Sequence, residues 1–79
     1  MNIKEFITKD NEILGGQTVF KSTRVPVETL FDHLEAGISL NQFLEDFPTV
    51  TKEQAIALLD CANKLFNTQN LEKLYEAVA

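Results

Sequence analysis

Cysteine and tryptophan are almost missing from this chain, whose 79 residues include one cysteine and no tryptophan. Cys61 has no second cysteine to pair with inside the chain, which excludes a disulfide framework. A single thiol suits the reducing cytoplasm, and we expect the protein there. The opening residues MNIKEF contain no apolar run, so we expect no signal peptide. No stretch approaches the ~18 apolar residues that a membrane-spanning helix needs.

Basic residues are also scarce, because 7 lysines and arginines stand against 12 aspartates and glutamates, for a net charge of −5. Up to Pro26 there are four bases and three acids (+1), whereas from Val27 onward there are three bases and nine acids (−6). The later part of the chain therefore repels phosphate at long range, and the first part does not. This distribution is unfavourable for a protein that binds nucleic acid.

Catalytic and metal-binding patterns are lacking as well. Gly15-Gly16 is not followed by the lysine and helix of a phosphate-binding P-loop. His33 falls outside the apolar stripe of its predicted helix, where we expect it to be exposed, and no second ligand stands at metal-binding spacing. We expect Cys61 to be buried and unreactive within a helix. No pair of carboxylates is placed for acid–base work, so we expect no catalytic residues, no metal, no cofactor and no enzymatic activity.

What the chain does contain is a short β-prone segment followed by helical patterns. Residues 6–8 are β-prone, and Val19 and Phe20 form a second short strand before a polar turn at residues 21–23. Strands this short must pair, either within the chain or with the strands of a second copy. We predict one domain, 1–79, with a strand and turn arm at residues 1–25. A core this small favours self-association, and we expect a homodimer.

Three amphipathic helices are predicted within residues 26–66. Pro26 suits the first turn of the first helix. Ser39 with Gln42, and Thr51 with Gln54, form capping-box patterns at the start of the second and third helices. Apolar residues recur at helical spacing in each: Val27, Leu30, Phe31 and Leu34; Leu40, Phe43, Leu44 and Phe47; Ala55, Leu58, Leu59, Ala62 and Phe66. The short connection FPTV between the last two indicates a unit of helix-turn-helix type.

A last apolar stripe lies within residues 67–79 and consists of Leu71, Leu74, Tyr75 and Val78. An isolated helix this short is marginal in water, so it needs a surface to lie on. That surface belongs to its own domain, to a second copy, or to another protein; we name the four residues as candidate partner-binding residues. The predicted fold class is mostly α, with a short N-terminal β-hairpin arm, a three-helix helix-turn-helix-like bundle and a C-terminal amphipathic helix.

Two motifs at a fixed separation carry a family resemblance. The first comprises Gly15, Gly16, Thr23, Arg24, Val25, Pro26 and Val27, and the second Ala36, Gly37, Ser39, Asp46, Phe47, Pro48, Val50 and Thr51. With these motifs, residues 14–59 resemble the domain-of-unknown-function family 433, small bacterial proteins similar to VapB-type antitoxins. The resemblance implies a helix-turn-helix-like fold, a dimer, a neighbouring toxin similar to a PIN-domain ribonuclease, and repression of its own operon. Family members carry glycine where this chain has Ser22, and serine adds strain there if the position needs a positive φ.

Seven residues are candidates for contact with nucleic acid: Lys21, Ser22, Thr23, Arg24, Thr51, Lys52 and Lys64. The guanidinium of Arg24 offers five donors to phosphate. Alternatively, Arg24 pairs with an acid of the first helix or caps carbonyl groups of its own turn. The third helix would be the recognition helix, although Glu53 and Asp60 repel phosphate, and the alternative is a solvated helix face over a core.

The expected function is that of an antitoxin-like protein that binds and neutralises a toxin, of the PIN-like ribonuclease type, and represses its own operon by binding DNA. Two alternatives remain open. One is a stand-alone helix-turn-helix-like DNA-binding regulator, and the other is an orphan protein-interaction module. The expected partners are therefore a cognate toxin, operator DNA and a second copy of the chain, with no membrane.

Overall fold

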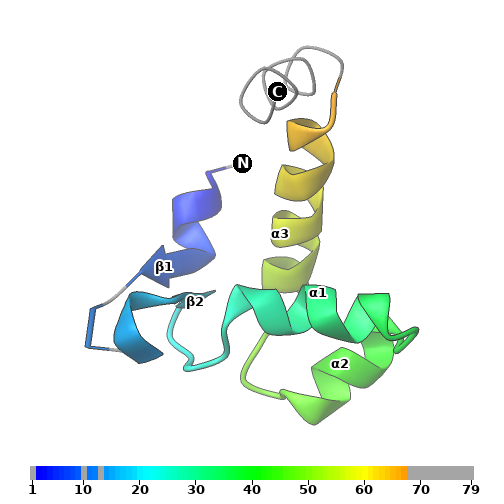
Figure 1. Cartoon of the computed structure of the whole chain (residues 1–79), viewed down its shortest axis with the longest axis horizontal. Helices are drawn as coiled ribbons and strands as arrows, with labels where there is room; N and C mark the ends of the chain where they lie inside the picture. Colours follow the sequence, from blue (N-terminus) through cyan, green and yellow to red (C-terminus); the bar gives the residue numbers. More distant parts are fainter. Residues whose placement is uncertain (1, 10, 13, 68–79) are drawn as a thin grey trace.

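The computed structural model describes residues 2–9, 11–12 and 14–67 and confirms a mostly helical fold with a short N-terminal sheet (Figure 1). Along the chain it contains the short 3-10 helices and strands η1 (Ile3–Glu5), β1 (Ile7–Lys9), η2 (Leu14–Gly16) and β2 (Thr18–Phe20), followed by the α-helices α1 (Val27–Glu35), α2 (Leu40–Asp46) and α3 (Lys52–Leu65). The helix expected within residues 67–79 falls almost wholly outside the described residues, and the described part ends just after α3 at Asn67.

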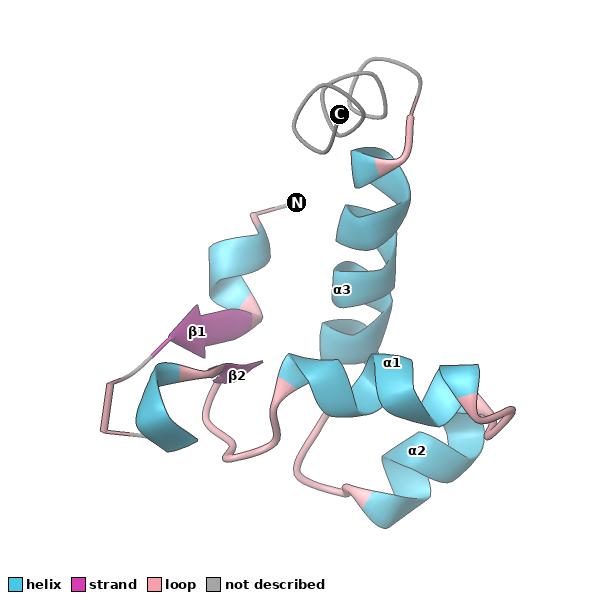
Figure 2. Ribbon diagram, in the orientation of Figure 1, coloured by secondary structure: helices cyan, strands magenta, loops and turns pink. Residues whose placement is uncertain are grey.

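The two strands pair with each other inside one chain, as Figure 2 shows. They are antiparallel, with Ile7 opposite Phe20, Thr8 opposite Val19 and Lys9 opposite Thr18. A further bridge joins Val19 to Pro26, so the chain between β2 and α1 folds back on the sheet. A hairpin of two short strands is marginal alone, and here it is stabilised because Val19 and Phe20 are fully buried.

Side-chain caps set the starts of α2 and α3. The Ser39 hydroxyl accepts a 3.1 Å hydrogen bond from the backbone N–H of Gln42. At α3 the capping box is complete, because the Thr51 hydroxyl accepts from the Gln54 N–H at 3.1 Å and the Gln54 side chain accepts from the Thr51 N–H at 2.9 Å. The box predicted at Ser39 is only half formed, since the Gln42 amide donates to Asp46 instead, at 2.9 Å.

One hydrophobic core joins the hairpin to the three helices. Its buried members come from β2, from all three helices and from the loop before α3: Phe20, Leu30, Phe43, Val50, Ala55 and Leu58. The ring of Phe43 lies at the centre, 6.1 Å from that of Phe20 and 5.1 Å from that of Phe47, measured between ring centroids. Because β2 supplies one of these rings, the arm is part of the core and is held at a fixed place against the bundle.

The predictions for His33 and Cys61 were wrong in their degree of burial. The His33 side chain is only 19% exposed, and its ring meets Phe43 and Phe47 edge-on at centroid distances of 5.3 and 5.4 Å. Its Nδ1 lies 2.9 Å from the carbonyl oxygen of Thr29, which can only accept, so Nδ1 carries the hydrogen. The packing of α2 covers a wider flank of α1 than the apolar stripe indicates. Cys61 is half-buried, with part of its surface open to solvent.

Candidate nucleic-acid interface

The turn at residues 21–24 is closed by its own backbone and by Thr23. The Phe20 N–H donates to the Val25 carbonyl and the Thr23 N–H donates to the Phe20 carbonyl, each at 3.0 Å. The Thr23 hydroxyl donates to the Phe20 carbonyl at 2.8 Å and accepts from the Val25 N–H at 3.0 Å. Thr23, a sequence-predicted contact residue, therefore holds the turn together, and its hydroxyl is already engaged.

Ser22 occupies the strained position of this turn. Its φ is +65°, and among the described residues it is the one non-glycine residue with a positive φ. The position does have a positive φ, which is the condition under which serine was expected to add strain there. The exposed Ser22 side chain stands at the tip between Lys21 and Arg24.

Gln54 fixes this turn against the start of α3. Its side-chain amide donates a 2.9 Å hydrogen bond to the Lys21 carbonyl and approaches the Phe6 carbonyl at 3.4 Å, while its oxygen completes the cap at Thr51. The Lys21 N–H in turn donates to the Phe6 carbonyl at 2.9 Å. The turn and the helix start, 33 residues apart in sequence, are therefore held side by side. The capping pattern in the sequence identified Gln54, but it could not indicate this second contact.

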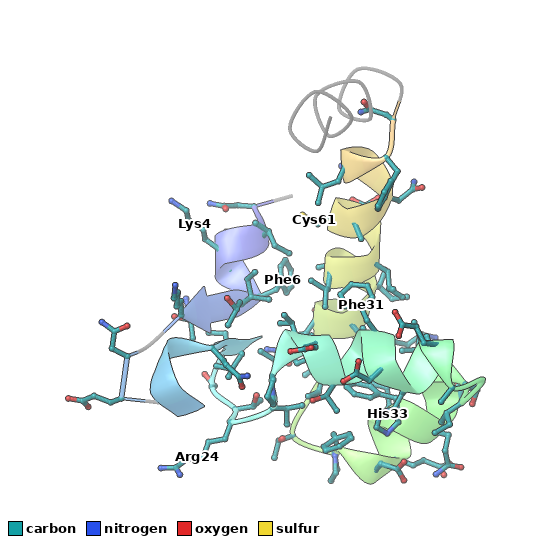
Figure 3. The ribbon with its side chains drawn as sticks, viewed as in Figure 1. Lys4, Phe6, Arg24, Phe31, His33 and Cys61 are labelled. Atoms are coloured by element: carbon teal, nitrogen blue, oxygen red, sulfur yellow. The ribbon has the colours of Figure 1, made fainter. Side chains whose placement is uncertain are left out.

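Three exposed cations lie on the two segments that this contact joins, and we call them the basic face: Lys21 and Arg24 in the turn, and Lys52 at the start of α3. No carboxylate of the described ranges forms an ion pair with any of them. In Figure 3 the Arg24 side chain extends away from the bundle. The alternative in which Arg24 pairs with an acid of the first helix is not what the structure has, so the guanidinium is available to a ligand. Thr51 lies at the same place but uses its hydroxyl as the cap of α3.

Lys64 does not belong to the basic face. Twelve residues separate it from Lys52 on the same helix, which corresponds to about 18 Å along the axis. Its Nζ lies 3.0 Å from a carboxylate oxygen of Asp60, one turn earlier. The sequence grouped Lys64 with the other candidates because of its charge, and the structure separates it because α3 is long.

Exposed acidic side chains lie on the same helix as Lys52 and on the helix that follows the turn. Glu53 is exposed directly beside Lys52 at the start of α3. On α1, the acids Glu28, Asp32 and Glu35 are all exposed. A duplex could therefore meet only a narrow strip of positive potential, with few phosphate contacts for each copy of the chain.

Apolar surface lies beside the basic face and at the far end of α3, and the sequence did not single out its members as sites. Phe6 and Ile56 line an open groove together with Lys52 and Glu53, and the Ile56 side chain is 43% exposed. At the end of α3, Leu65 and Phe66 are 53% and 64% exposed. The candidate partner-binding residues Leu71, Leu74, Tyr75 and Val78 follow in sequence and lie outside the described residues.

Metal-ligand clusters and membrane-spanning helices are both missing from the described part of the chain. In that part, no three His, Cys, Asp or Glu side chains come together as they would around a metal ion. None of the helices in the same residues has the length and apolar character needed to cross a bilayer. The basic face and the apolar surfaces are therefore the candidate sites among the described residues.

Comparison with known proteins places the chain in a family. The chain is 37% identical over 51 residues to the uncharacterized protein y4eO of Sinorhizobium fredii (strain NBRC 101917 / NGR234), a match that covers 65% of this chain. The chain spans only 23% of the length of that relative. No solved structure matches the chain. Residues 7–62, which include both strands and most of the three helices, match the family described as "Protein of unknown function (DUF433)", and the chain belongs to this family.

Proposed function

We propose that this chain is an antitoxin-like protein with two activities: it binds operator DNA through the basic face, and it binds and neutralises a partner toxin of the PIN-like ribonuclease type. The observation that supports the DNA-binding activity best is the Gln54 hydrogen bond, which holds the turn carrying Lys21 and Arg24 beside Lys52. A turn whose backbone is already fixed against α3 does not have to be ordered when it binds phosphates, so only the basic side chains lose freedom.

The basic face favours a dimer on DNA. Three cations give each copy of the chain only a modest number of phosphate contacts. The exposed acids of α1 and α3 further weaken the positive potential that attracts DNA. Two copies related by a twofold axis double the number of neutralised phosphates and match the symmetry of a palindromic operator. In this arrangement the acidic α1 surface must lie away from the duplex.

The toxin-binding activity rests on the family resemblance and on apolar surface. Leu65 and Phe66 are the most exposed large apolar residues at the end of α3, and the stripe of Leu71, Leu74, Tyr75 and Val78 follows within a few residues. Amphipathic segments of this kind dock in grooves of partner proteins. We therefore propose this end of the chain, remote from the basic face, as the contact with the toxin.

The DNA-binding activity is tested by a gel shift with the DNA upstream of the gene, across a salt series from low to physiological ionic strength. A triple variant with Lys21→Ala, Arg24→Ala and Lys52→Ala should lose about tenfold or more in affinity. Lys64→Ala is the matched control, because Lys64 already pairs with Asp60 at the other end of the helix. If the triple variant and the control bind equally well, the basic face is not the contact.

The toxin-binding activity is tested by co-expression with the neighbouring reading frame. The neighbour should be harmful when expressed alone and harmless with this chain, and the two proteins should co-purify. If the neighbour is harmless alone and nothing co-purifies while the gel shift succeeds, the stand-alone regulator is the better description. If both experiments fail, an orphan protein-interaction module remains.

A further inference from the structure

The turn after β2 is a type II β-turn with serine at the position that favours glycine. The Thr23 N–H donates to the Phe20 carbonyl at 3.0 Å and closes the turn, with Lys21 and Ser22 at its centre. Ser22 has a φ of +65°, whereas Lys21 is not among the residues with a positive φ. This order of signs defines type II, because a type I turn has a φ of about −90° at the third residue.

The chain on both sides of the central peptide is fixed by other hydrogen bonds. The Lys21 N–H donates to the Phe6 carbonyl at 2.9 Å. The Thr23 hydroxyl donates to the Phe20 carbonyl at 2.8 Å and so ties the two ends of the turn together. Types I and II differ in ψ of the second residue and φ of the third. The peptide between Lys21 and Ser22 can therefore rotate from one type to the other while these flanking bonds stay in place.

Gln54 is the residue that holds this central peptide in the type II orientation. Its side-chain amide donates a 2.9 Å hydrogen bond to the Lys21 carbonyl oxygen, across 33 residues of sequence. A type I turn would rotate that carbonyl by about 150°, which turns it away from Gln54. Without the bond, the steric cost of a positive φ at serine favours the type I turn. The type of turn therefore depends on a side chain of α3.

The type II orientation leaves the Ser22 N–H without a hydrogen-bond partner among the described residues. The peptide bond is trans, so this N–H points opposite to the Lys21 carbonyl and therefore away from Gln54. The Ser22 residue is exposed, and the exposed side chains of Lys21 and Arg24 belong to the same turn. A free backbone donor on a turn that carries two cations is a favourable contact for a phosphate oxygen.

We propose that the Ser22 N–H donates to a phosphate oxygen, and that Gln54 is a positioning residue that keeps this N–H turned outward. In a type I turn the Lys21 carbonyl oxygen would be turned away from Gln54 instead, and it would repel phosphate. Phosphate and Gln54 thus select the same orientation of one peptide, so loss of either weakens the hold of the other. The inference deepens the proposed DNA binding and rests on it for the source of the phosphate.

NMR of the full chain measures the orientation of the peptide, through the nuclear Overhauser effect between the Lys21 Hα and the Ser22 amide hydrogen. These hydrogens are close in a type II turn, where ψ of about +120° nearly eclipses them, and farther apart in type I. Gln54→Glu keeps an acceptor for the Thr51 N–H but cannot donate to Lys21, so the effect should weaken about threefold or more. In the double variant with Ser22→Gly the effect should stay strong, since glycine adopts a positive φ without help.

Titration of isotope-labelled protein with inorganic phosphate measures the contact itself. In the wild type, the Ser22 amide signal should move downfield, and further than with sodium chloride at the same ionic strength. Apparent affinity falls by the same factor as the population of the competent turn, so Q54E should bind phosphate about threefold or more weakly. The double variant Q54E/S22G should recover most of that loss although its charge is the same. The upstream duplex should distinguish the two variants in the same direction.

Rescue by glycine separates a positioning role from a structural one, because a purely structural loss would persist in the double variant. The inference is wrong if Q54E keeps the strong Overhauser effect, or if glycine restores no affinity. It is also wrong if the wild-type Ser22 amide responds equally to phosphate and to chloride, a measurement that needs no variant. Failure of the proposed DNA binding gives a different result: the upstream duplex does not shift in the gel, while inorganic phosphate still moves the Ser22 amide. Free phosphate or another phosphate compound is then the source.

Discussion

Gln54 on α3 and Lys21 in the hairpin turn are joined by a 2.9 Å hydrogen bond from the side-chain amide of Gln54 to the backbone carbonyl oxygen of Lys21, across 33 residues of sequence. The same side chain caps α3 through its oxygen, which accepts from the Thr51 N–H. One residue therefore both starts the helix and attaches it to the turn. The basic face exists as a unit because of this double use.

Gln54→Glu separates the two roles. A carboxylate can still accept from the Thr51 N–H, but it has no hydrogen to donate to the Lys21 carbonyl. We expect a loss of about 1–2 kcal/mol in the free energy of unfolding, measured by urea denaturation, from the unmade hydrogen bond. Gln42→Glu is the control, because the Gln42 amide bonds only the exposed Asp46 within α2, and it should cost about 0.5 kcal/mol or less. Equal losses in the two variants would contradict the attachment role of Gln54.

Ser22→Gly is expected to stabilise the protein. Serine at φ +65° carries a steric cost of about 1–2 kcal/mol, and glycine removes it while adding a smaller entropy cost in the unfolded chain. The net gain should be about 0.5–1 kcal/mol, which raises the melting temperature by roughly 2–8 °C in a domain of this size. Ser39→Gly, at φ −68° and with a capping hydroxyl, should change stability in the opposite direction. If S22G lowers the free energy of unfolding instead, the Ser22 side chain stabilises the turn by more than its backbone strain costs.

The elements that local chemistry specifies were predictable from the sequence. Caps at Ser39 and Thr51 set two helix starts correctly, because each cap bonds to an N–H only three residues away. The pairing of the strands within one chain was not predictable, since three-residue strands contain too little pattern to choose a partner. The family resemblance anticipated the strain at Ser22, which no periodicity indicates.

The candidate site was predictable in composition but not in arrangement. Charge alone selected Lys64 together with Lys52, whereas the length of α3 places them at opposite ends. The engagement of the Thr23 hydroxyl and the distant contact of Gln54 depend on tertiary placement, which sequence spacing does not encode.

His33→Ala is expected to destabilise the link between α1 and α2. The imidazole contacts the rings of Phe43 and Phe47 and bonds the Thr29 carbonyl, so truncation removes packing and a hydrogen bond together. We expect a loss of about 1–3 kcal/mol in the free energy of unfolding, measured by thermal and urea denaturation. The neighbouring Asp32→Ala is the control, since Asp32 is exposed on the same helix and should change stability by about 0.5 kcal/mol or less. If His33→Ala is as mild as Asp32→Ala, the aromatic contacts contribute nothing.

The salt dependence of DNA binding tests the basic face residue by residue. Each neutralised phosphate steepens the fall of log affinity against log salt by about 0.9. Lys21→Ala, Arg24→Ala and Lys52→Ala should therefore each make the fall shallower by about 0.9 for a monomer on the duplex and by about 1.8 for a dimer, which loses two contacts at once. Lys64→Ala should leave the slope unchanged, because Lys64 pairs with Asp60 away from the face. A dimer that neutralises six phosphates would lose about 10³ in affinity between 50 and 200 mM salt, whereas a monomer that neutralises three would lose a few tens-fold. The measured slope therefore reports the number of copies on the duplex, and four variants with the wild-type slope would show that DNA, if bound, is held elsewhere.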